Sequence, residues 1–462
     1  MAIHIRDFVG RRLHMIGIGG SSMSGLAGLL HDTGYAVSGS DNYASHHIDE
    51  VRALGIPVVI GHHAENMRDA DLIVYSAAIA AENPERLEAK RAGIPEMERS
   101  TLLGQLMEGY GQAVGISGTH GKTTTTAMLA QALIHAGLEP SIHIGGDFDH
   151  IGGGTRIGAR NIFIAEACEF HASFLEMRPT IAVVLNIDAD HLDFYRDIDH
   201  IAEAFGRFVS LVPENGSLIG NGDDPRVRKL FQAAQCRVLS FGIGPENGMR
   251  AENIRYDGLG YPAFDLMLHG TRLAGVQLRV GGAFNILNAL AALAAAHALG
   301  VDIEKAAQGI SAFTGVRRRL EHTGTVDGVR LYHDYGHNPV EMKGALSVIK
   351  MQPHDRLIAV LQPHTYSRVK RLFDDYIHCA DDADIILVTD IYAARESNPG
   401  DIHSGMLVDR MRAEGLDVHL TPTFDDTERT LRELWRPGDV VLTMGCGNIN
   451  ELNERMGGEK QI

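Results

Sequence analysis

The sequence predicts three unlike α/β domains. Its 462 residues exceed one core of ordinary size, since domains are commonly about 100 to 200 residues long. Short apolar runs alternate with helical patterns along the chain, which predicts parallel sheets built from strand, helix and strand units. Two glycine-rich turns each follow such a run and open a helical pattern, and no repeat of fixed period is visible.

The expected strands fall into three sets. Those of the first domain are 13–18, 36–38, 57–60 and 72–75. A break near residues 108–111 precedes the second set, which is 113–117, 161–165, 180–186, 217–220 and 237–241, followed by an alanine-rich helix after Asn285. From about Arg319 a third set follows, at 329–332, 357–361, 385–389 and 440–444. Its regular alternation predicts another doubly wound sheet.

The composition limits the classes of function. A formal net charge of −17 argues against general nucleic-acid binding, because neutralising phosphates requires clustered Lys and Arg. The four cysteines form no CxxC pair, which indicates a reducing compartment. Charges near the N-terminus argue against a signal peptide, and no apolar run is long enough to span a bilayer. We expect a cytoplasmic protein without membrane insertion.

The strongest motif is the run Gly118-Thr119-His120-Gly121-Lys122-Thr123-Thr124-Thr125, which follows an expected strand and opens a helix near Thr123. Glycines let backbone N–H groups close around phosphate oxygens, and the helix N-terminus adds its positive end. Lys122 is expected to pair with the β- and γ-phosphates, and Thr123 to offer its hydroxyl to Mg²⁺. The alternative is a plain glycine turn, which the Lys-Thr pair after a strand disfavours. The motif therefore predicts ATP binding.

A metal-bound triphosphate needs further ligands near that loop, and in such sheets they follow the carboxyl ends of neighbouring strands. Glu166 follows one expected strand, and Asp188, Asp190 and His191 follow another. A histidine at a strand end is more often structural, but a carboxylate on an adjoining strand favours a ligand. These residues are the candidates for a metal site.

The turn Gly17-Ile18-Gly19-Gly20 follows the first expected strand, and Ser40-Asp41 lies near the end of the next. Its spacing does not give G-x-G-x-x-G, so the resemblance to a dinucleotide-binding turn is weak. The turn can still hold a diphosphate on the helix N-terminus. A tight turn without a ligand is the alternative.

Two polar clusters follow strands of the third domain. They are Asp334-Tyr335-Gly336-His337-Asn338-Pro339 and Gln362-Pro363-His364-Thr365-Tyr366-Ser367-Arg368. Both are expected at the sheet edge where ligands bind in open α/β folds, although a solvated loop face is the alternative. Arg368 has a planar fork suited to a carboxylate. The run 317–319, three arginines, is either a solvated face or a contact with nucleotide phosphates.

Together these motifs resemble those of the Mur ligases of bacterial cell-wall synthesis, and the resemblance covers essentially the whole chain. The marks that carry it are Gly17-Ile18-Gly19-Gly20 with Gly39-Ser40-Asp41, Gly118 to Thr125, Glu166-Ala167-Cys168-Glu169, Asn186-Ile187-Asp188-Ala189-Asp190-His191, Asn285-x-x-Asn288, Asp334-Tyr335-Gly336-His337 and Gln362 to Arg368.

The resemblance implies a Rossmann-like domain over 1–107 that binds a UDP sugar, a central P-loop ATPase-like domain over 108–318 and a C-terminal Rossmann-like domain over 319–462 that binds an amino acid. The implied reaction joins L-alanine to the lactyl carboxylate of UDP-N-acetylmuramate in peptidoglycan precursor synthesis. ATP first makes an acyl phosphate of that carboxylate, with Mg²⁺ as the metal, and ADP and phosphate are released. We expect a monomer or weak homodimer whose third domain closes over the second.

Carried over residue by residue, the resemblance also implies site residues. The expected catalytic residues are Lys122, Glu166, His191, His364 and Arg368. The expected metal ligands are Thr123, Glu166 and His191. The residues expected to bind ATP are Gly118, Thr119, His120, Gly121, Lys122, Thr123, Thr124, Asn285, Asn288, Arg319, Asp334, Tyr335 and His337. The residues expected to bind the other substrates are Gly19, Gly20, Ser40, Asp41, Ser76, His364 and Arg368.

Three positions depart from the pattern of relatives. Phe284 stands where His usually precedes the first Asn of the adenine motif, so ring stacking could replace a polar contact. Cys168 stands where many relatives carry Asp. Phe205 stands where some sister ligases carry a modified lysine, and this favours the alanine-adding branch.

Three other functions compete with this interpretation. A murein-recycling ligase would attach a tripeptide to the same sugar nucleotide, but the motif from Gln362 to Arg368 favours the alanine-adding branch. An NAD-linked oxidoreductase would explain the first glycine turn and leave Lys122 unexplained. A non-catalytic nucleotide-binding module would need neither His364 nor Arg368.

Overall fold

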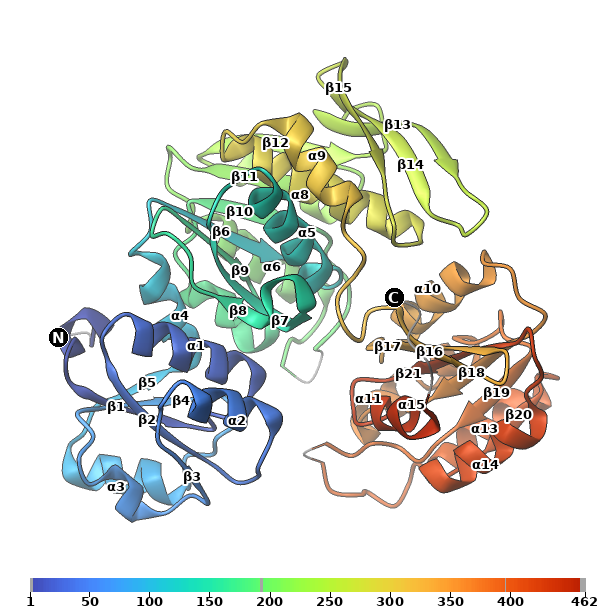
Figure 1. Cartoon of the computed structure of the whole chain (residues 1–462), viewed down its shortest axis with the longest axis horizontal. Coiled ribbons are helices and arrows are strands. Elements are labelled where there is room, and N and C mark those ends of the chain that lie inside the picture. Colours follow the sequence, from blue (N-terminus) through green and yellow to red (C-terminus); the bar gives the residue numbers. More distant parts are fainter. Residues whose placement is uncertain (1–2, 192–193, 395, 458–462) are drawn as a thin grey trace. The chain divides into compact units, whose positions relative to one another are not determined.

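The computed structural model describes residues 3–191, 194–394 and 396–457. The predicted domain ends at 1–2 and 458–462 lie outside this part of the chain. Two compact units are present, of which the first is Met1–Asn253, Phe264–Val276 and Ile286–Phe313 and the second is Ile254–Ala263, Gln277–Asn285 and Thr314–Ile462. Three sheets confirm the predicted α/β class (Figure 1).

The first sheet has five parallel strands in the order β3-β2-β1-β4-β5. The strands are β1 (Arg12–Ile16), β2 (Ala36–Asp41), β3 (Val58–Ile60), β4 (Leu72–Tyr75) and β5 (Glu96–Glu98). The helices are η1 (Ile5–Phe8), α1 (Ser21–Asp32), α2 (His46–Ala53), η2 (Ala64–Met67), α3 (Pro84–Ala92) and α4 (Arg99–Met107). The strand order reverses between β1 and β4, and ligands bind at the carboxyl ends of strands at such a point.

The second sheet has ten strands in the order β15-β14-β13-β12-β11-β10-β6-β9-β7-β8. The strands are β6 (Gln112–Ser117), β7 (Ser141–Phe148), β8 (Gly153–Arg156), β9 (Ile162–Glu166), β10 (Ile181–Val184), β11 (Ser217–Asn221), β12 (Arg237–Gly242), β13 (Met249–Tyr256), β14 (Pro262–Leu268) and β15 (Thr271–Gln277). The helices are α5 (Lys122–His135), η3 (Asp149–Ile151), η4 (Phe170–Glu176), α6 (Ile198–Val209), α7 (Pro225–Ala233), α8 (Ala283–Ala298) and α9 (Ile303–Ser311). β6 pairs in parallel with β10 on one side and β9 on the other, so the segments after these three strands meet at one edge.

The third sheet has six strands in the order β16-β17-β21-β18-β19-β20, and only the β16–β17 pairing is antiparallel among these neighbours. The strands are β16 (Glu321–Val326), β17 (Val329–Asp334), β18 (Leu357–Leu361), β19 (Ile385–Val388), β20 (Val418–Leu420) and β21 (Val440–Met444). The helices are α10 (Pro339–Lys350), α11 (Tyr366–Arg371), α12 (Phe373–Ile377), α13 (Ser404–Ala413), α14 (Phe424–Leu434) and α15 (Asn450–Met456).

The third sheet is buried on both faces. Leu357, Ala359 and Leu361 of β18 belong to one apolar cluster, whereas Ile358 and Val360 belong to another. Successive residues of a strand point to opposite faces of its sheet. A strand of this kind is a continuous apolar run, which explains why β18 was visible in the sequence.

Every strand expected from the sequence is present, with ends shifted by a few residues. The sequence did not indicate β5, β7, β8, β13, β14, β15, β16 and β20. α8, the alanine-rich helix, begins at Ala283 rather than after Asn285. Within the described residues, no helix combines the length and apolar character needed to cross a membrane.

The junction between the first two sheets is tightly packed. Leu102 and Leu103 of α4 and Phe174 of η4 are buried in one apolar cluster. A Cβ added to Gly104 of α4 would lie 1.9 Å from the carbonyl oxygen of Glu176. Only a residue without a side chain allows α4 to approach η4 so closely.

We expect Gly104→Ala to destabilise this junction by about 1–3 kcal/mol, because the added methyl group meets backbone that cannot rotate away. The apparent melting temperature measures the effect. Gly344→Ala in α10 is the matched control, since a Cβ there would meet nothing within 4 Å. The same change in both variants would contradict the prediction.

Candidate active site

The loop between β6 and α5 depends on its two glycines. Gly118 has φ +147 and Gly121 has φ +87, a backbone region that side chains disfavour. An added Cβ would lie 2.8 Å from the Leu185 Cβ at Gly118 and 2.5 Å from the Asn288 Oδ1 at Gly121. At these two positions the loop backbone packs directly on Leu185 and Asn288, with no space for a side chain. Gly121 is the N-cap of α5.

The segment after β10 holds this loop in place. The Asn186 side chain accepts a hydrogen bond from the His120 N–H at 2.8 Å and donates one to the His120 carbonyl at 3.0 Å. The Thr119 hydroxyl accepts from the Asp188 N–H at 2.9 Å. A hydrogen bond from His120 lowers the pKa of Asp188. Asn186 acts here as a brace for the loop, a role that the sequence did not indicate.

Lys122 is folded back over its own loop. Its ammonium donates to the carbonyls of Gly118 and Thr119 and lies 2.8 Å from the Glu169 Oε2. Burial lowers the pKa of Lys122, but Glu169 together with Cys168 and Glu166 outweighs burial, so the pKa lies above its ordinary value. Lys122 is thus a fixed positive charge at the start of α5.

Glu169 also connects the predicted residues Lys122 and His191. The His191 Nε2 lies 3.7 Å from the Glu169 Oε1, and His191 has φ +51. Tyr195 donates a hydrogen bond to the Glu169 carbonyl at 2.5 Å, and burial raises the pKa of this tyrosine to about 12. Glu169 is buried and was not among the predicted site residues. The motif around Glu166 was its only signal.

The predicted metal ligands lie on three neighbouring segments. Glu166 is the last residue of β9, Thr123 is in the first turn of α5, and His191 follows β10. The Glu166 Oε1 accepts from the Gly145 N–H at 2.8 Å. A carboxylate and a hydroxyl are the oxygen donors that Mg²⁺ prefers, so Glu166 and Thr123 suit it better than the imidazole of His191 does.

The predicted adenine residues lie at the start of α8. Asn288 accepts a hydrogen bond from the Thr125 hydroxyl at 3.2 Å and so links α8 to α5. Asn285 donates to the Gly281 carbonyl at 2.7 Å. Phe284 is 43% exposed, which leaves its ring accessible for stacking. Thr124 lies in the first turn of α5 and is partly exposed.

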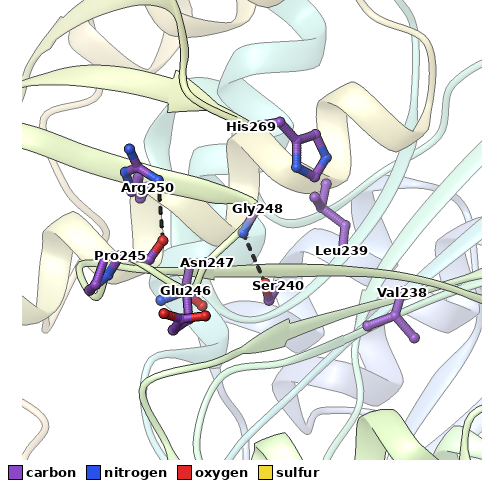
Figure 2. A pocket seen from close by; sticks show the side chains of 9 residues that line it. All are labelled: Val238, Leu239, Ser240, Pro245, Glu246, Asn247, Gly248, Arg250 and His269. Carbon is purple, nitrogen blue, oxygen red and sulfur yellow. Dashed lines mark hydrogen bonds between the residues drawn. The ribbon is translucent and has the colours of Figure 1, made fainter.

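A polar pocket of about 380 Å³ lies beside the loop. Its lining residues are His120, Asn186, Ile187, Asp188, Asn221, Asp223, Asp224, Pro225 and Arg226. Another pocket, of about 450 Å³, lies at β12 and β13 and is lined by the residues in Figure 2. It contains none of the predicted site residues, which separates it from the phosphate loop.

The first glycine turn lies at the point where the strand order reverses. Gly17 has φ +80, and a Cβ there would lie 3.4 Å from the Ile79 Cδ1 and 3.8 Å from the Ser76 Cβ. A Cβ on Gly19 would lie 2.8 Å from Ile48. Gly20 caps α1 without a side chain of its own. Gly17 and Ser76 therefore lie next to each other at the ends of β1 and β4, while Gly19 lies beside Ile48 and Gly20 beside the Gly17 carbonyl.

Ser40 and Asp41 support this turn. The Ser40 carbonyl accepts from the Gly17 and Ile18 N–H groups at 2.8 and 3.1 Å. The Asp41 Oδ2 accepts from the Gly19 N–H at 2.9 Å. The Ser40 side chain is fully buried and is bound to other protein groups, so its hydroxyl faces the interior of the domain.

In the third sheet, Asp334 and two arginines organise the segment before β16. The Asp334 carboxylate accepts from the Leu320 N–H at 2.8 Å and the Gly336 N–H at 2.7 Å. Burial raises the pKa of Asp334 against the opposing effect of Arg319. The guanidinium groups of Arg318 and Arg319 each lie 4.8 Å from the Tyr335 ring centroid.

The segment after β21 lies between the two predicted clusters of this sheet, because β21 separates β17 from β18. Arg318 donates to the Gly447 carbonyl at 2.8 Å, and Gln362 donates to the Asn448 Oδ1 at 3.0 Å. This segment was not among the predicted site residues. The feature of the sequence that could have revealed it is the glycine-rich run 445–447 directly after an expected strand.

His364 and Arg368 are in direct contact. The Arg368 Nη1 donates a hydrogen bond to the His364 Nδ1 at 2.9 Å, and the centroids of the His337 and His364 rings lie 5.5 Å apart. A guanidinium only donates, so Nδ1 is the acceptor and the neutral ring carries its proton on Nε2. Burial, His337 and Arg368 lower the pKa of His364 to about 4. Tyr392 stacks on the ring at 5.8 Å.

Comparison with known proteins identifies the family. Models of the Mur ligase family match three segments, described as the Mur ligase family catalytic domain at 12–110, the Mur ligase middle domain at 116–296 and the Mur ligase glutamate ligase domain at 318–447. The UDP-N-acetylmuramate–L-alanine ligase of Acetivibrio thermocellus is 44% identical over 453 residues, which are 98% of this chain and 97% of that protein. The chain belongs to the Mur ligase family.

Solved Mur ligase structures share the fold. The UDP-N-acetylmuramate–alanine ligase of Thermotoga maritima superposes with a TM-score of 0.82 at 24% identity, over 96% of this chain and 98% of that one. A murein peptide ligase of Psychrobacter arcticus gives 0.73 at 24% identity, over 97% and 98%. The family match covers each of the three sheets described above.

We expect the His364 ring to titrate near pH 4, because burial and two neighbouring cationic groups disfavour its protonation. NMR of histidine-labelled protein, assigned with His364→Gln, measures the midpoint. Arg368→Gln should raise the midpoint, whereas Arg371→Gln on the exposed side of α11 should not. A wild-type midpoint near the ordinary value of about 6.5 would contradict the geometry.

Proposed function

We propose that the chain is an ATP-dependent ligase that joins L-alanine to the lactyl carboxylate of UDP-N-acetylmuramate in peptidoglycan precursor synthesis. The observation that carries the proposal is the loop from Gly118 to Thr123 with Lys122 held at its centre, in a chain that matches alanine-adding ligases over nearly its full length. The fold that the chain shares with the T. maritima ligase supports this proposal.

In the proposed reaction, the lactyl carboxylate attacks the γ-phosphorus of ATP and ADP leaves. The neutral alanine amine then attacks the resulting acyl phosphate, and the tetrahedral intermediate expels phosphate while its nitrogen gives up one proton and keeps the other as the amide N–H. Several anionic groups must converge, so catalysis rests on positioning and charge neutralisation. The loop N–H groups and the start of α5 receive the phosphates.

Lys122 must exchange partners for this reaction. In the structure its ammonium is neutralised by Glu169 and bound to two loop carbonyls. An arriving triphosphate offers a higher negative charge in the same place, so Lys122 turns from its own loop to the β- and γ-phosphates. Glu169 is then available to His191, whose Nε2 already lies 3.7 Å away.

Mg²⁺ completes the proposed site. Thr123 and Glu166 would supply oxygen ligands, with His191 close by, and the ion would neutralise charge on the transferred phosphoryl group. The braces described above, Asn186 on the loop and the Gly145 N–H on Glu166, would keep these donors in position.

The amino-acid and sugar carboxylates are assigned to His364 and Arg368. Because the Arg368 fork already donates to His364, the pair presents a guanidinium and an Nε2–H donor of fixed tautomer. Both are suited to anionic oxygens. ATP contacts are also proposed for Arg319, Asp334, Tyr335 and His337, and the sugar diphosphate is assigned to Gly19, Gly20, Asp41 and Ser76.

The proposal includes a cytoplasmic monomer or weak homodimer. All four cysteines are free thiols, which fits a reducing compartment where ATP is available. Burial raises the pKa of Cys379 and of Cys446 to about 12, so these thiols stay protonated and unreactive at neutral pH.

We expect purified protein to release ADP and phosphate only when UDP-N-acetylmuramate, Mg²⁺ and an amino acid are all present. A coupled assay should be run side by side with L-alanine, glycine, L-serine and the tripeptide of the murein-recycling reaction. L-Alanine should give the highest kcat/KM. Strong activity with tripeptide and none with L-alanine would instead assign the chain to the recycling branch.

We expect Lys122→Ala to lower kcat by at least about 100-fold, because the variant loses a positive charge that acts on the transferred phosphoryl group. Calorimetry should give unchanged binding of UDP-N-acetylmuramate, since Lys122 begins the helix after β6 of the second sheet, whereas the first glycine turn follows β1 of the first sheet. Lys305→Ala, at an exposed position of α9, is the matched control. Equal loss of turnover and sugar-nucleotide binding would refute this separation of sites.

A further inference from the structure

A fully buried carboxylate lies behind the first glycine turn. Glu85 is 0% exposed and occupies the first turn of α3, after the N-cap Asn83 and Pro84. A buried charge is costly unless it is paired and hydrogen-bonded. The phosphate loop and the third sheet lie elsewhere in the fold and do not need this carboxylate. The reason for a buried charge at Glu85 must therefore be sought among the groups around it.

The carboxylate gathers groups from four separate segments. Its Oε2 accepts from the Ser40 hydroxyl at 2.6 Å and lies 3.3 Å from the His62 Nδ1. Its Oε1 accepts from the Asn66 side chain at 2.5 Å and lies 3.7 Å from the His14 Nε2. Both oxygens are therefore occupied, and the partners come from β1, β2, η2 and the segment between β3 and η2.

Glu85 is held in its charged form. Burial raises its pKa, but the nearby His14 imidazole and the hydrogen bonds from Ser40 and Asn66 together outweigh burial, so the pKa lies below the ordinary value. The first turn of a helix also favours a negative charge. A fixed anion that faces several donors orients them more strongly than a neutral acceptor would.

Two of the segments bound by Glu85 lead to the first glycine turn: β1 runs into it along the chain, and the end of β2 is hydrogen-bonded to it. The Ser40 carbonyl accepts from Gly17 and Ile18, while the Asp41 carbonyl accepts from the Gly61 N–H at 2.7 Å. Glu85 thus binds the side chain of Ser40 at the end of β2, and the backbone carbonyl of Ser40 in turn binds the first glycine turn. The Glu85 carboxylate itself lies too deep to meet a ligand.

Arg86, the next residue, holds the opposite side. Its Nη1 donates to the Ile79 carbonyl at 3.0 Å and its Nε to Glu96 at 3.0 Å, while its guanidinium lies 3.8 Å from the Tyr75 ring centroid. Ile79 in turn packs on Gly17. Glu85 and Arg86, in the first helical turn of α3, therefore bind the end of β2 and the segment after β4, which lie on the two sides of the first glycine turn.

We propose that Glu85 is a positioning residue for uridine diphosphate recognition, acting through Ser40 and the loop at 61–63 without touching the ligand. The inference rests on the proposed function for the identity of the ligand. It adds a residue that no sequence motif indicated, and it accounts for the buried position of the Ser40 hydroxyl.

Glu85→Gln is a sharp test because it keeps the shape of the side chain. Both Glu85 oxygens are acceptors, whereas an amide nitrogen only donates, so either Asn66 loses its partner or the Ser40 hydroxyl must change from donor to acceptor. We expect the Kd for UDP and the KM for UDP-N-acetylmuramate to rise at least about tenfold, as for loss of a hydrogen bond to a charged group. kcat and the KM for ATP should stay as in the wild type.

Glu88→Gln is the matched control, since Glu88 lies on the same helix and pairs with Arg91 at the surface. Calorimetry with UDP alone reports on the turn without ligation chemistry. Wild-type affinity for UDP in Glu85→Gln would overturn the inference. A Glu85→Gln variant whose kcat falls and whose KM values for all substrates change by the same factor would also overturn it. Failure of the wild type to bind UDP would instead overturn the proposed function.

A second variant covers the case in which Glu85→Gln does not fold. Asn66→Ala removes one donor to the carboxylate at a partly exposed position and leaves Ser40 in place. We expect a smaller rise in the Kd for UDP in the same direction, with no change in the KM for ATP. Unchanged UDP affinity in folded Asn66→Ala would overturn the inference.

Discussion

The close approach of bare backbone between β6 and the segment after β10 is the constraint on which the central site depends. Gly118 and Gly121 have positive φ values and no room for a Cβ, so the loop passes close to the segment after β10 before α5 begins. Asn186 binds both backbone groups of His120 and holds the loop in this shape. A loop held in this way would lose little entropy on binding the phosphates proposed above. The parallel pairing of β6 with β9 and β10 then places the acidic and imidazole groups around it.

The ion pair between Lys122 and Glu169 neutralises the positive charge at the start of α5. Breaking a buried pair by deleting one partner leaves a charge without compensation, which is commonly worth about 3–5 kcal/mol. The cationic loop is therefore stable only while some anion faces Lys122, whether Glu169 or a phosphate. Such an exchange would let the nucleotide replace an internal partner of the same sign, so that Lys122 is never left without a neutralising anion.

Strands such as β6, β10 and β18 were predictable because both faces are covered and the sequence is continuously apolar. β14 alternates buried and partly buried residues, and β5 and β20 have only three residues each. None of these three strands gives a strong local pattern in the sequence. The lysine and glycines of the phosphate loop were visible for a similar reason, since their spacing is local. Glu169 and Asn186 stand in motifs that the sequence showed and Glu85 stands in none, but the contacts of all three were not predictable, because their partners lie far along the chain and only the fold brings them together.

The opposed contacts of Glu85 and Arg86 have a consequence for the length of the segment that connects β4 to α3. One residue of an α-helix corresponds to a rotation of about 100° around its axis. An insertion or deletion between Ile79 and Asn83 that shifted the helical register would therefore turn the carboxylate out of its pocket and the guanidinium away from Tyr75. Homologues should vary freely in the exposed side chains of this segment while keeping its number of residues, so a gap in an alignment here would mark a protein with a differently built nucleotide pocket.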